Sequence, residues 1–404
     1  MTTPSKEKLT HALVLHAPRD LRLESRLTPA PKHGELQIAI RATGLCGSDL
    51  HYYNHGRNGD FIVQSPLCLG HESSGIITAI GPDVADTFHI GDRVALEVGL
   101  PCHSCPLCLQ GRYNICRKLR FRSSAKTFPH LDGTLMECTN HSAEMCHTLP
   151  ATVDDVQGAL IEPLAVCLHA IRRSKPPSAE LVDLARSGGQ ETGALIFGAG
   201  AIGILLASAL AATQHFTTLI IADIDEARLN LASSLPFPQG KIQTFLLPKS
   251  TSASALPPET ETKTAQQILS TFSIPYGFSR TYDCTGVASC IRTGIHATGP
   301  GGAVVLIGMG GEPQPHIPLA AAALREVDLI GVFRYDARGY PDAVELMGSG
   351  KLEGVAEKVA THRVRLEDGV RAFELAGKGV DEEGRAVVKV MVVSGEDDGR
   401  GPEL

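Results

Sequence analysis

Four cysteines fall within sixteen residues of a chain that carries only eleven: they lie in PCHSCPLCLQGRYNIC (101–116) and are Cys102, Cys105, Cys108 and Cys116. Short loops with this spacing let four thiolates converge on one tetrahedral zinc at about 2.3 Å. Such a closed site leaves no coordination position for a substrate. We therefore expect a structural zinc that braces this loop, and the catalytic chemistry has to lie elsewhere.

A second set of metal-binding side chains is spread over three segments. Cys46 lies in GLCGSDLHYY, and His71 and Glu72 are adjacent in LGHESSG. Glu162 lies in the apolar segment GALIEPLAV, where an unpaired carboxylate would be costly. A zinc with three protein ligands and a water is open to a substrate, and Cys46, His71 and one or both glutamates could supply it. The residues alone leave the choice between the two glutamates open.

The segment ALIFGAGAIG has the spacing of a dinucleotide-binding loop. Gly198, Gly200 and Gly203 follow a predicted strand and precede an Ala/Leu-rich helix, so the helix N-terminus can attract a pyrophosphate. Asp223 ends the next predicted strand, TLIIAD, where a carboxylate can accept hydrogen bonds from the adenosine ribose. Its charge would repel a 2′-phosphate and so favours NAD over NADP. Arg228, one helical turn on, is either an adenine contact or a solvated helix residue.

The elements that must position these residues change character along the chain. From about residue 11 to 150, short β-like runs such as LQIAIRA and SGIITAIG are separated by Gly, Pro and Asp turns, which predicts a mainly antiparallel, barrel-like half. From about residue 165, apolar strands alternate with helical segments, which predicts a parallel sheet. Two Ser/Thr/Pro/Glu-rich stretches, 174–192 and 248–264, are expected to be surface insertions or mobile loops.

Composition and charge narrow the class of protein. The chain has 404 residues, of which 43% are hydrophobic and 20% charged, and this is ordinary globular composition. A net charge of -7 gives no basic surface for nucleic acid, which argues against a four-cysteine zinc knuckle of a nucleic-acid module. The N-terminus MTTPSKEKLT is polar, and the longest apolar runs, such as AIGILLASALAA, are too short to span a bilayer. We therefore expect a soluble, cytoplasmic protein that acts on a small molecule, with no membrane partner.

Several motifs together resemble the zinc-dependent medium-chain dehydrogenases, polyol branch, which contains sorbitol and xylitol dehydrogenases. They are GLCGSDLHYYNHGR, PLCLGHESSG, GDRVALEVGLPC, ALIEPLAVCLHA, FGAGAIG and REVDLIGVFRY. The resemblance runs from about residue 11 to 392. It implies an α/β fold: a GroES-like β-barrel catalytic domain over 1–165, completed by 324–404, and a Rossmann doubly wound parallel sheet over 166–323 that binds NAD.

The resemblance also implies roles for single residues. Cys46, His71 and Glu72 would ligate a catalytic zinc, with Glu162 as a further ligand or a water-mediated partner. Ser48 and His51 are two and five residues past Cys46 and would pass a substrate proton to solvent, although a turn hydroxyl and a surface imidazole are equally good readings. The substrate would contact Tyr52, Phe61, Glu162 and Arg325.

These expectations add up to a zinc- and NAD-dependent polyol dehydrogenase with two zinc ions per chain, one catalytic and one structural. It would oxidise xylitol or sorbitol at the C2 hydroxyl to a ketose, and relatives suggest a homotetramer. The alternatives are an L-arabinitol 4-dehydrogenase and a catalytically silent NAD-binding homologue. Two departures bear on the substrate, since SSAKTFPHLDG is longer than the matching loop of relatives and RYDARGYP differs from their usual RYCNTWP.

Overall fold

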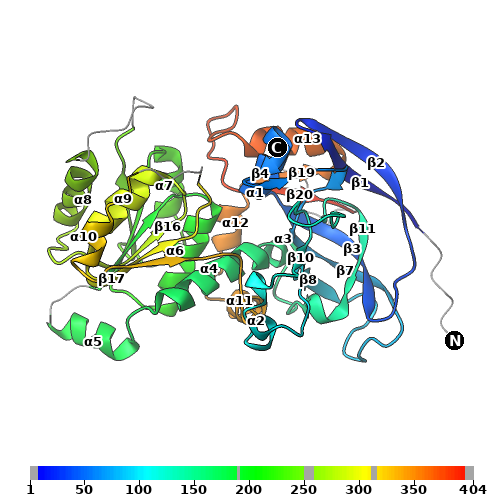
Figure 1. Cartoon of the computed structure of the whole chain (residues 1–404), viewed down its shortest axis with the longest axis horizontal. Helices are drawn as coiled ribbons and strands as arrows, with labels where there is room; N and C mark the ends of the chain where they lie inside the picture. Colours follow the sequence, from blue (N-terminus) through cyan, green and yellow to red (C-terminus); the bar gives the residue numbers. More distant parts are fainter. Residues whose placement is uncertain (1–7, 189–191, 250–258, 311–315, 396–404) are drawn as a thin grey trace. The chain divides into compact units, whose positions relative to one another are not determined.

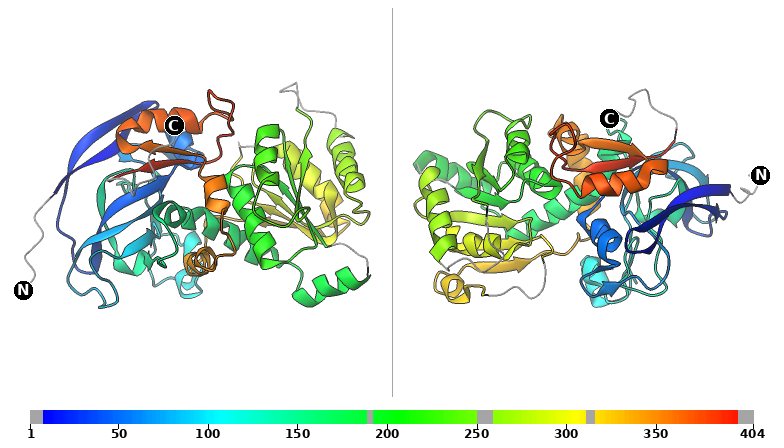
Figure 2. Two further views of the ribbon diagram at one scale, coloured as in Figure 1. Left: turned by 180° about the vertical axis from the view of Figure 1, so that it is seen from behind. Right: turned by 90° about the horizontal axis from the view of Figure 1, so that it is seen from above.

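The computed structural model of the chain divides into two compact units (Figures 1 and 2). It describes residues 8–188, 192–249, 259–310 and 316–395. One unit holds the described residues up to Ala165 together with those from Asp336 onward, and the other holds Val166–Tyr335. Within the described ranges, no helix combines the length and the apolar character that a membrane crossing requires.

The first unit is built on mainly antiparallel sheets, in which β19 pairs parallel with β20. Its largest sheet has the strand order β12-β8-β7-β3-β20-β19, with β11 also paired to β3, and a smaller sheet has the order β2-β1-β6. The bounds of the strands are β1 Lys8–Ala17, β2 Asp20–Thr28, β3 Glu35–Gly44, β6 Leu67–Cys68, β7 Glu72–Ile80, β8 Arg93–Leu96, β11 Cys138–Ser142, β12 Cys146–Thr148, β19 His362–Arg365 and β20 Val390–Val393. This matches the barrel-like half that the short β-runs predict.

Segments far apart in the sequence pair in this unit. Strand β20, near the C-terminus, pairs antiparallel with the end of β3 through Met391 and Gly44, so segments at the two ends of the colour scale lie side by side (Figure 1). Short strands close the remaining loops: β4 Arg57–Asn58 pairs with β5 Phe61–Ile62, and β9 Gly99–Leu100 pairs with β10 Arg120–Phe121. The C-terminal segment therefore completes the unit that carries the predicted zinc ligands.

The first unit also contains short helices. Their bounds are α1 Gly47–His55, α2 Pro106–Leu109, α3 Asp155–Ala159, α11 Gly339–Gly348, α12 Val355–Val359 and α13 Gly369–Ala376. Helix α13 packs against the core beneath β1, where Phe373 lies against Tyr53 of α1 with ring centroids 4.9 Å apart. Helix α4, Ile161–Ser174, starts in the first unit and continues into the second.

The second unit is a parallel sheet with the strand order β15-β14-β13-β16-β17-β18. The strands are β13 Gly193–Phe197, β14 Thr218–Asp223, β15 Ile242–Leu246, β16 Phe278–Asp283, β17 Thr298–Leu306 and β18 Asp328–Gly331. The helices of this unit are α5 Ala179–Gly188, α6 Ala201–Thr213, α7 Glu226–Ser233, α8 Glu259–Thr271, α9 Ala288–Ala297 and α10 Leu319–Ala323.

The strands at the centre of this sheet are buried on both faces. Leu195 and Phe197 of β13 pack with Ala265 and Ile268 of α8 on one face, while the alternate residue Ile196 is equally buried on the other. Figure 1 shows helices on both sides of the sheet, which is the doubly wound arrangement that the alternating pattern predicts.

Three sequence expectations differ from the observed fold. The second domain boundary lies after Tyr335 and not after 323, because β18 belongs to the parallel sheet as the neighbour of β17. The stretch 174–192 is not a loop throughout, since helix α5 occupies most of it. Within 248–264, residues 250–258 lie outside the described part of the chain, and helix α8 begins at Glu259.

Candidate functional site

Three of the predicted ligands of the catalytic metal converge in the first unit. The sulfur of Cys46, a ring nitrogen of His71 and a carboxylate oxygen of Glu72 all lie within 4.8 Å of one another. Cys46 is the residue at which helix α1 starts, and Glu72 is the first residue of β7. Strand β3 ends at Gly44, two residues before Cys46, and Gly44 pairs with Glu72. This pairing brings the two ligand-bearing segments together.

A buried aspartate, Asp49, links the segments that carry these ligands. Its Oδ2 accepts a hydrogen bond from the Cys46 N–H at 3.2 Å, and its Oδ1 accepts one from the Gly70 N–H at 3.2 Å. The same Oδ1 lies 3.3 Å from Nδ1 of His71, which leaves Nε2 of His71 for a metal. Burial alone would raise the pKa of Asp49, but His71 and the hydrogen bond from Ser123 lower it below its ordinary value. Asp49 therefore carries a negative charge beside the cluster.

Glu72 has a buried cationic partner, Lys389. The Lys389 Nζ lies 2.8 Å and 2.7 Å from the two carboxylate oxygens of Glu72 and also donates to the Leu45 carbonyl at 3.0 Å. The carboxylate fits only because residue 44 is glycine, since a Cβ there would lie 2.3 Å from Glu72 Oε2. Burial would lower the pKa of Lys389, yet the carboxylate of Glu72 raises it above its ordinary value. Glu72 is thus held as a charged group whose oxygens are available to a metal.

The side chains around His71 favour a positive charge at this position. Burial opposes a charge on the imidazole, but Asp49 and Cys46 outweigh it and raise the pKa of His71 well above its ordinary value. Without a metal, a proton on His71 supplies the positive charge that these neighbours favour. A zinc ion bound by Cys46, His71 and Glu72 would supply it in place of that proton, and the thiolate, imidazole and carboxylate set suits zinc.

Glu162 lies outside this group of three within the described residues. It is buried in the first turn of helix α4, and its charge contributes to the raised pKa of Lys389. Both glutamates therefore raise the pKa of Lys389, but of the two only Glu72 belongs to the group of converging ligands.

The other residues expected near a substrate are grouped around helix α1. Ser48 is half-buried in its first turn, and His51 lies exposed one turn later. Tyr52 is buried, and its hydroxyl accepts a hydrogen bond from the Ala125 N–H at 3.0 Å. Phe61 is half-buried in the short strand β5.

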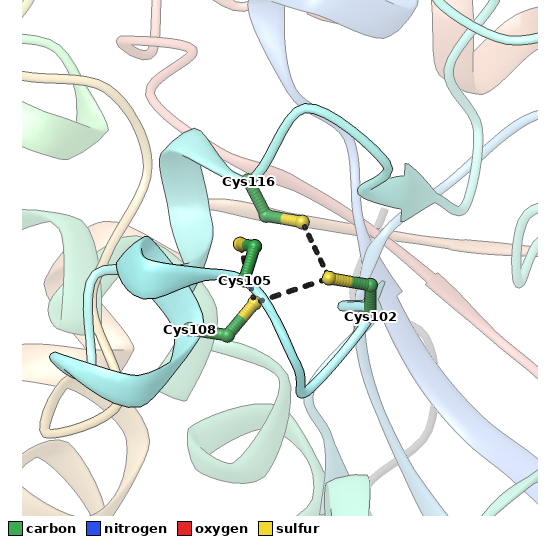
Figure 3. A group of neighbouring side chains, drawn as sticks. All are labelled: Cys102, Cys105, Cys108 and Cys116. Carbon is green, nitrogen blue, oxygen red and sulfur yellow. Dashed lines mark hydrogen bonds between the residues drawn. The ribbon is translucent and has the colours of Figure 1, made fainter.

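The four clustered cysteines converge as their spacing predicts (Figure 3). Their sulfurs are 3.5 Å apart for Cys105 and Cys108, 3.6 Å for Cys102 and Cys116, and 3.9 Å for Cys102 and Cys108. A tetrahedron with metal–sulfur bonds of about 2.3 Å has edges of about 3.8 Å, so the set fits one zinc. Hydrogen bonds from the backbone and hydroxyl of Ser104 lower the pKa of Cys102 to about 5, which makes that sulfur a thiolate at neutral pH.

This cysteine loop is tied to the barrel at its base and in its middle. The pairing of β9 with β10 closes the base of the loop. Near the middle, the Tyr113 hydroxyl donates to Glu97, whose other carboxylate oxygen lies 2.6 Å from Nε2 of His147. Burial and the Glu97 charge raise the pKa of Tyr113 well above its ordinary value, so the phenol stays protonated as the donor. Glu97 lies in the quoted motif GDRVALEV, but nothing in the sequence indicated its partners.

The glycine loop of the second unit has the geometry that its motif requires. Gly198 has φ +97°, a conformation that other residues rarely adopt. A Cβ at Gly203 would lie 1.8 Å from the Gly198 carbonyl, so glycine allows the helix to pack on the turn. At Gly200, the residue at which α6 starts, a Cβ would meet no atom within 4 Å. Gly200 therefore leaves open space at a helix N-terminus, where a phosphate group would fit.

Asp223 lies beside this loop at the end of β14. Its Oδ2 accepts from the Ala199 N–H at 2.6 Å and its Oδ1 accepts from the Asp225 N–H at 2.9 Å. Arg228 lies in the first turn of α7, which Asp225 caps. A second buried aspartate, Asp283, ends β16, and its oxygens accept from the N–H groups of Thr285 and Gly286. The sequence did not single out Asp283, although it ends a strand beside β13 as Asp223 does.

Arg325 takes a different place from the one expected for a substrate contact. Its guanidinium donates to three backbone carbonyls of its own unit, those of Ala321 at 2.9 Å and of Thr298 and Ile295 at 2.7 Å each. The Ile295 carbonyl belongs to the last turn of α9, where helix carbonyls lack partners within the helix. Arg325 is therefore a structural cap, and we leave it out of the proposed substrate site.

Comparison with known proteins gives matches over nearly the whole chain. Two family models match: Alcohol dehydrogenase GroES-like domain over residues 32–151 and Zinc-binding dehydrogenase over residues 201–349. Sorbitol dehydrogenase from Rattus norvegicus is 38% identical over 398 residues, which cover 97% of this chain and 98% of that protein. Probable D-xylulose reductase A from Emericella nidulans is 34% identical over 381 residues, 94% of this chain and 96% of that protein. Among solved structures, L-idonate 5-dehydrogenase from Escherichia coli has a TM-score of 0.78 and 25% identity, covering 96% of this chain and 100% of that one.

Proposed function

Because the chain belongs to the zinc-binding dehydrogenases with an alcohol dehydrogenase GroES-like domain, we propose that it is a polyol dehydrogenase. The proposed reaction is the NAD-dependent oxidation of xylitol or sorbitol at the C2 hydroxyl to a ketose. The observation that carries it is the convergence of Cys46, His71 and Glu72 in a chain that is 38% identical to a sorbitol dehydrogenase over 97% of its length. A binding protein without catalysis would have no use for an open set of ligands.

The proposed chemistry divides between the metal and the chain. Zinc, when bound, acts as a Lewis acid that makes a substrate hydroxyl more acidic. Ser48 and the exposed His51 take the released proton from the hydroxyl toward solvent. The hydrogen on the same carbon leaves as hydride with both electrons and reduces NAD⁺ to NADH. Asp49 orients His71 throughout, and Tyr52, Phe61 and Glu162 are the residues proposed to contact the polyol.

We propose NAD and not NADP as the cofactor because of Asp223. Its carboxylate is buried and fixed by two backbone N–H groups at the end of β14, so it cannot swing away from an added phosphate. A 2′-phosphate there would meet a like charge. Replacing Asp223 by serine should therefore narrow the preference for NAD by about tenfold or more in kcat/KM, which corresponds to about 1.4 kcal/mol. An unchanged ratio of kcat/KM for the two cofactors would contradict this role.

The function is tested with a panel of alcohols at fixed NAD. Xylitol and sorbitol should be oxidised with kcat/KM orders of magnitude above that for ethanol, because a site with several polar groups rejects substrates that leave them unpaired. The Cys46→Ser variant should fold and bind NAD but not turn over, and it serves as the control for catalysis by the mixed site. Activity on L-arabinitol alone would assign the chain to the L-arabinitol 4-dehydrogenases. Inactivity on every polyol in protein that holds two zinc ions would contradict the proposal, and a single zinc per chain would favour a silent homologue.

We also propose that the protein is a homo-oligomer of the reducing cytoplasm. All eleven cysteines are free thiols, including the four that converge for a metal, which suits a reducing compartment. Strand β18 ends the described parallel sheet. Leu329 lies exposed on it, and the described parts of the connection from β17 to β18 expose three more large apolar side chains, Met309, Leu319 and Leu324. In the other unit, Leu9 and Leu27 are opposite each other on β1 and β2 and are both 63% exposed. Two separate apolar surfaces are what a tetramer with two kinds of interface needs.

A further inference from the structure

Ser123 adopts a backbone conformation that serine rarely takes. It follows strand β10, has φ +57°, and is buried, with 3% of its surface exposed. A residue other than glycine in this region carries strain of about 1 kcal/mol or more, and glycine would be free of it. A serine retained under such strain indicates that its hydroxyl is used.

Within the described part of the chain, the hydrogen bond of this hydroxyl goes to Asp49. The Ser123 Oγ donates to Asp49 Oδ1 at 2.7 Å, which is the shortest of the contacts that this carboxylate makes. Asp49 has no exposed surface, accepts from the Cys46 N–H, and lies 3.3 Å from Nδ1 of His71. Ser123 therefore acts on the group that orients two of the metal ligands.

The loop is built to present this hydroxyl. The preceding residue, Arg122, is buried and donates to the Asp132 carbonyl at 2.9 Å, to Nδ1 of His141 at 3.2 Å and to the Asn140 carbonyl. Burial and Arg122 lower the pKa of His141 to about 3, so the imidazole is neutral and its nitrogen is free to accept.

The backbone on both sides of the hydroxyl is also fixed. The Ser123 N–H donates to the Leu131 carbonyl at 3.0 Å, and the Ala125 N–H donates to the Tyr52 hydroxyl at 3.0 Å. The hydroxyl is thus held in position before any metal or substrate binds, and little entropy is lost in using it.

We infer that Ser123 is a positioning residue of the catalytic metal site. Its hydrogen bond fixes the Asp49 carboxylate so that His71 presents Nε2 to the metal. The inference rests on the proposed metal site. It goes beyond that site because it gives a role to Ser123, which contacts Asp49 and through Asp49 acts on the ligand His71. The sequence gives the segment RFRSSAKTFPHLDG no such role.

The test compares three single variants of the full-length, metal-loaded protein. Ser123→Ala removes the hydroxyl and keeps the strain, and Ser123→Gly removes both. Ser124→Ala is the matched control, because the neighbouring Ser124 hydroxyl accepts from the Lys126 N–H and makes no hydrogen bond to Asp49. The first readout is the affinity of the mixed site for Co²⁺, followed through its d–d absorption while zinc fills the thiolate cluster. Outer partners of metal ligands contribute about 10- to 100-fold, and Ser123 is one bond further out, so we expect about tenfold weaker binding in both Ser123 variants. Ser124→Ala should bind as the wild type does.

The second readout separates positioning from folding. Ser123→Gly should be more stable to heat than Ser123→Ala, because both lack the hydroxyl and glycine alone relieves the strain, and yet it should bind Co²⁺ as poorly as Ser123→Ala does. In both variants kcat on the polyol should fall with little change in the KM for NAD. Metal affinity within twofold of the wild type in Ser123→Ala would overturn the inference, as would a loss in Ser123→Ala that Ser123→Gly restores, since strain and not the hydroxyl would then be responsible. Weakened Co²⁺ binding in a protein that oxidises no polyol would uphold Ser123 and reject the proposed function instead.

Discussion

At the scale of single residues, the sequence predicted three side chains that converge as a possible metal site and missed the residues that hold them. Cys46, His71 and Glu72 could be predicted because their side chains belong to the small set that binds zinc. Asp49 and Lys389 are equally close to the chemistry. Asp49 lies within the motif GLCGSDLHYYNHGR, but nothing in that motif marks it as a partner of the ligands, and Lys389 lies outside the quoted motifs. The available signal was context: Lys389 interrupts the apolar run VVKVMVV, where a charge needs a partner. Which partner it has depends on β20 pairing with β3, and that contact joins opposite ends of the chain.

Lys389 gives a prediction at this scale. Lys389→Met should lower the free energy of unfolding by about 3–5 kcal/mol, because it leaves the buried Glu72 carboxylate without its cation. Urea denaturation of wild type and variant measures the difference, with zinc in the four-cysteine site and none in the mixed site, where it would itself pair with Glu72. Lys389→Arg keeps the charge and should recover part of the loss. Adding Glu72→Gln to Lys389→Met should also recover stability, since no unpaired charge then remains. Equal stability of Lys389→Met and wild type would show that the pair contributes nothing.

At the scale of elements, the cysteine loop was predicted more fully than any other part. Spacing alone predicted that the four sulfurs converge, because short loops leave few other arrangements. The pairing of β9 with β10, each two residues long, was beyond prediction because such short strands carry no periodic pattern. Helix α5 was missed for a related reason: its Pro and Ser neighbours made the whole of 174–192 look irregular, although AELVDLARSG has helical spacing of its apolar residues.

Substitution in the cysteine loop should lower stability, whereas substitution in the mixed site of Cys46, His71 and Glu72 should abolish turnover. Cys105→Ser should reduce the metal content from two zinc ions per chain to one and lower the midpoint of thermal unfolding, since structural zinc binds isolated peptides with about 10–16 kcal/mol. The expected loss is smaller here because Tyr113 and the β9–β10 pair also anchor the loop. Metal analysis and calorimetry measure the two effects. Cys290→Ser, a cysteine outside both ligand groups, is the control and should keep both zinc ions. Loss of turnover in a Cys105→Ser protein of unchanged stability would reverse the two assignments.

At the scale of the whole molecule, the change from antiparallel to parallel patterns predicted two units, and the structure has two. The first boundary could be read because apolar alternation gives way to βαβ order near residue 165. The second could not, because β18 is four residues long and its sequence, DLIG, carries no sign of the sheet that it joins. A strand at the edge of a sheet is hydrogen-bonded to one neighbouring strand. Within the described residues, that neighbour of β18 is β17.

The free edge of β18 leads to a prediction about assembly. The Val332 N–H donates to the Leu306 carbonyl of β17, and since successive residues of a strand point to opposite sides, the N–H of Leu329 points to the open edge. An exposed edge with apolar side chains, among them Leu324 at 88% exposure, favours pairing with a second copy of the same strand. Leu329→Pro removes an outward N–H and spares the bonds to β17, so it should halve the mass of the oligomer measured by light scattering.

Two further variants decide whether this edge is the interface. Leu324→Glu should act like Leu329→Pro, because it places a charge in a contact that the apolar side chains would otherwise fill. Leu184→Glu is the matched control, since Leu184 is also a strongly exposed leucine, at 68%, but lies on helix α5 of the same unit. It should leave the mass unchanged. If Leu329→Pro and Leu324→Glu both kept the wild-type mass, β18 would not be an interface. A drop in mass with Leu184→Glu alone would place the contact on α5, whose exposed leucines would then be covered in the oligomer.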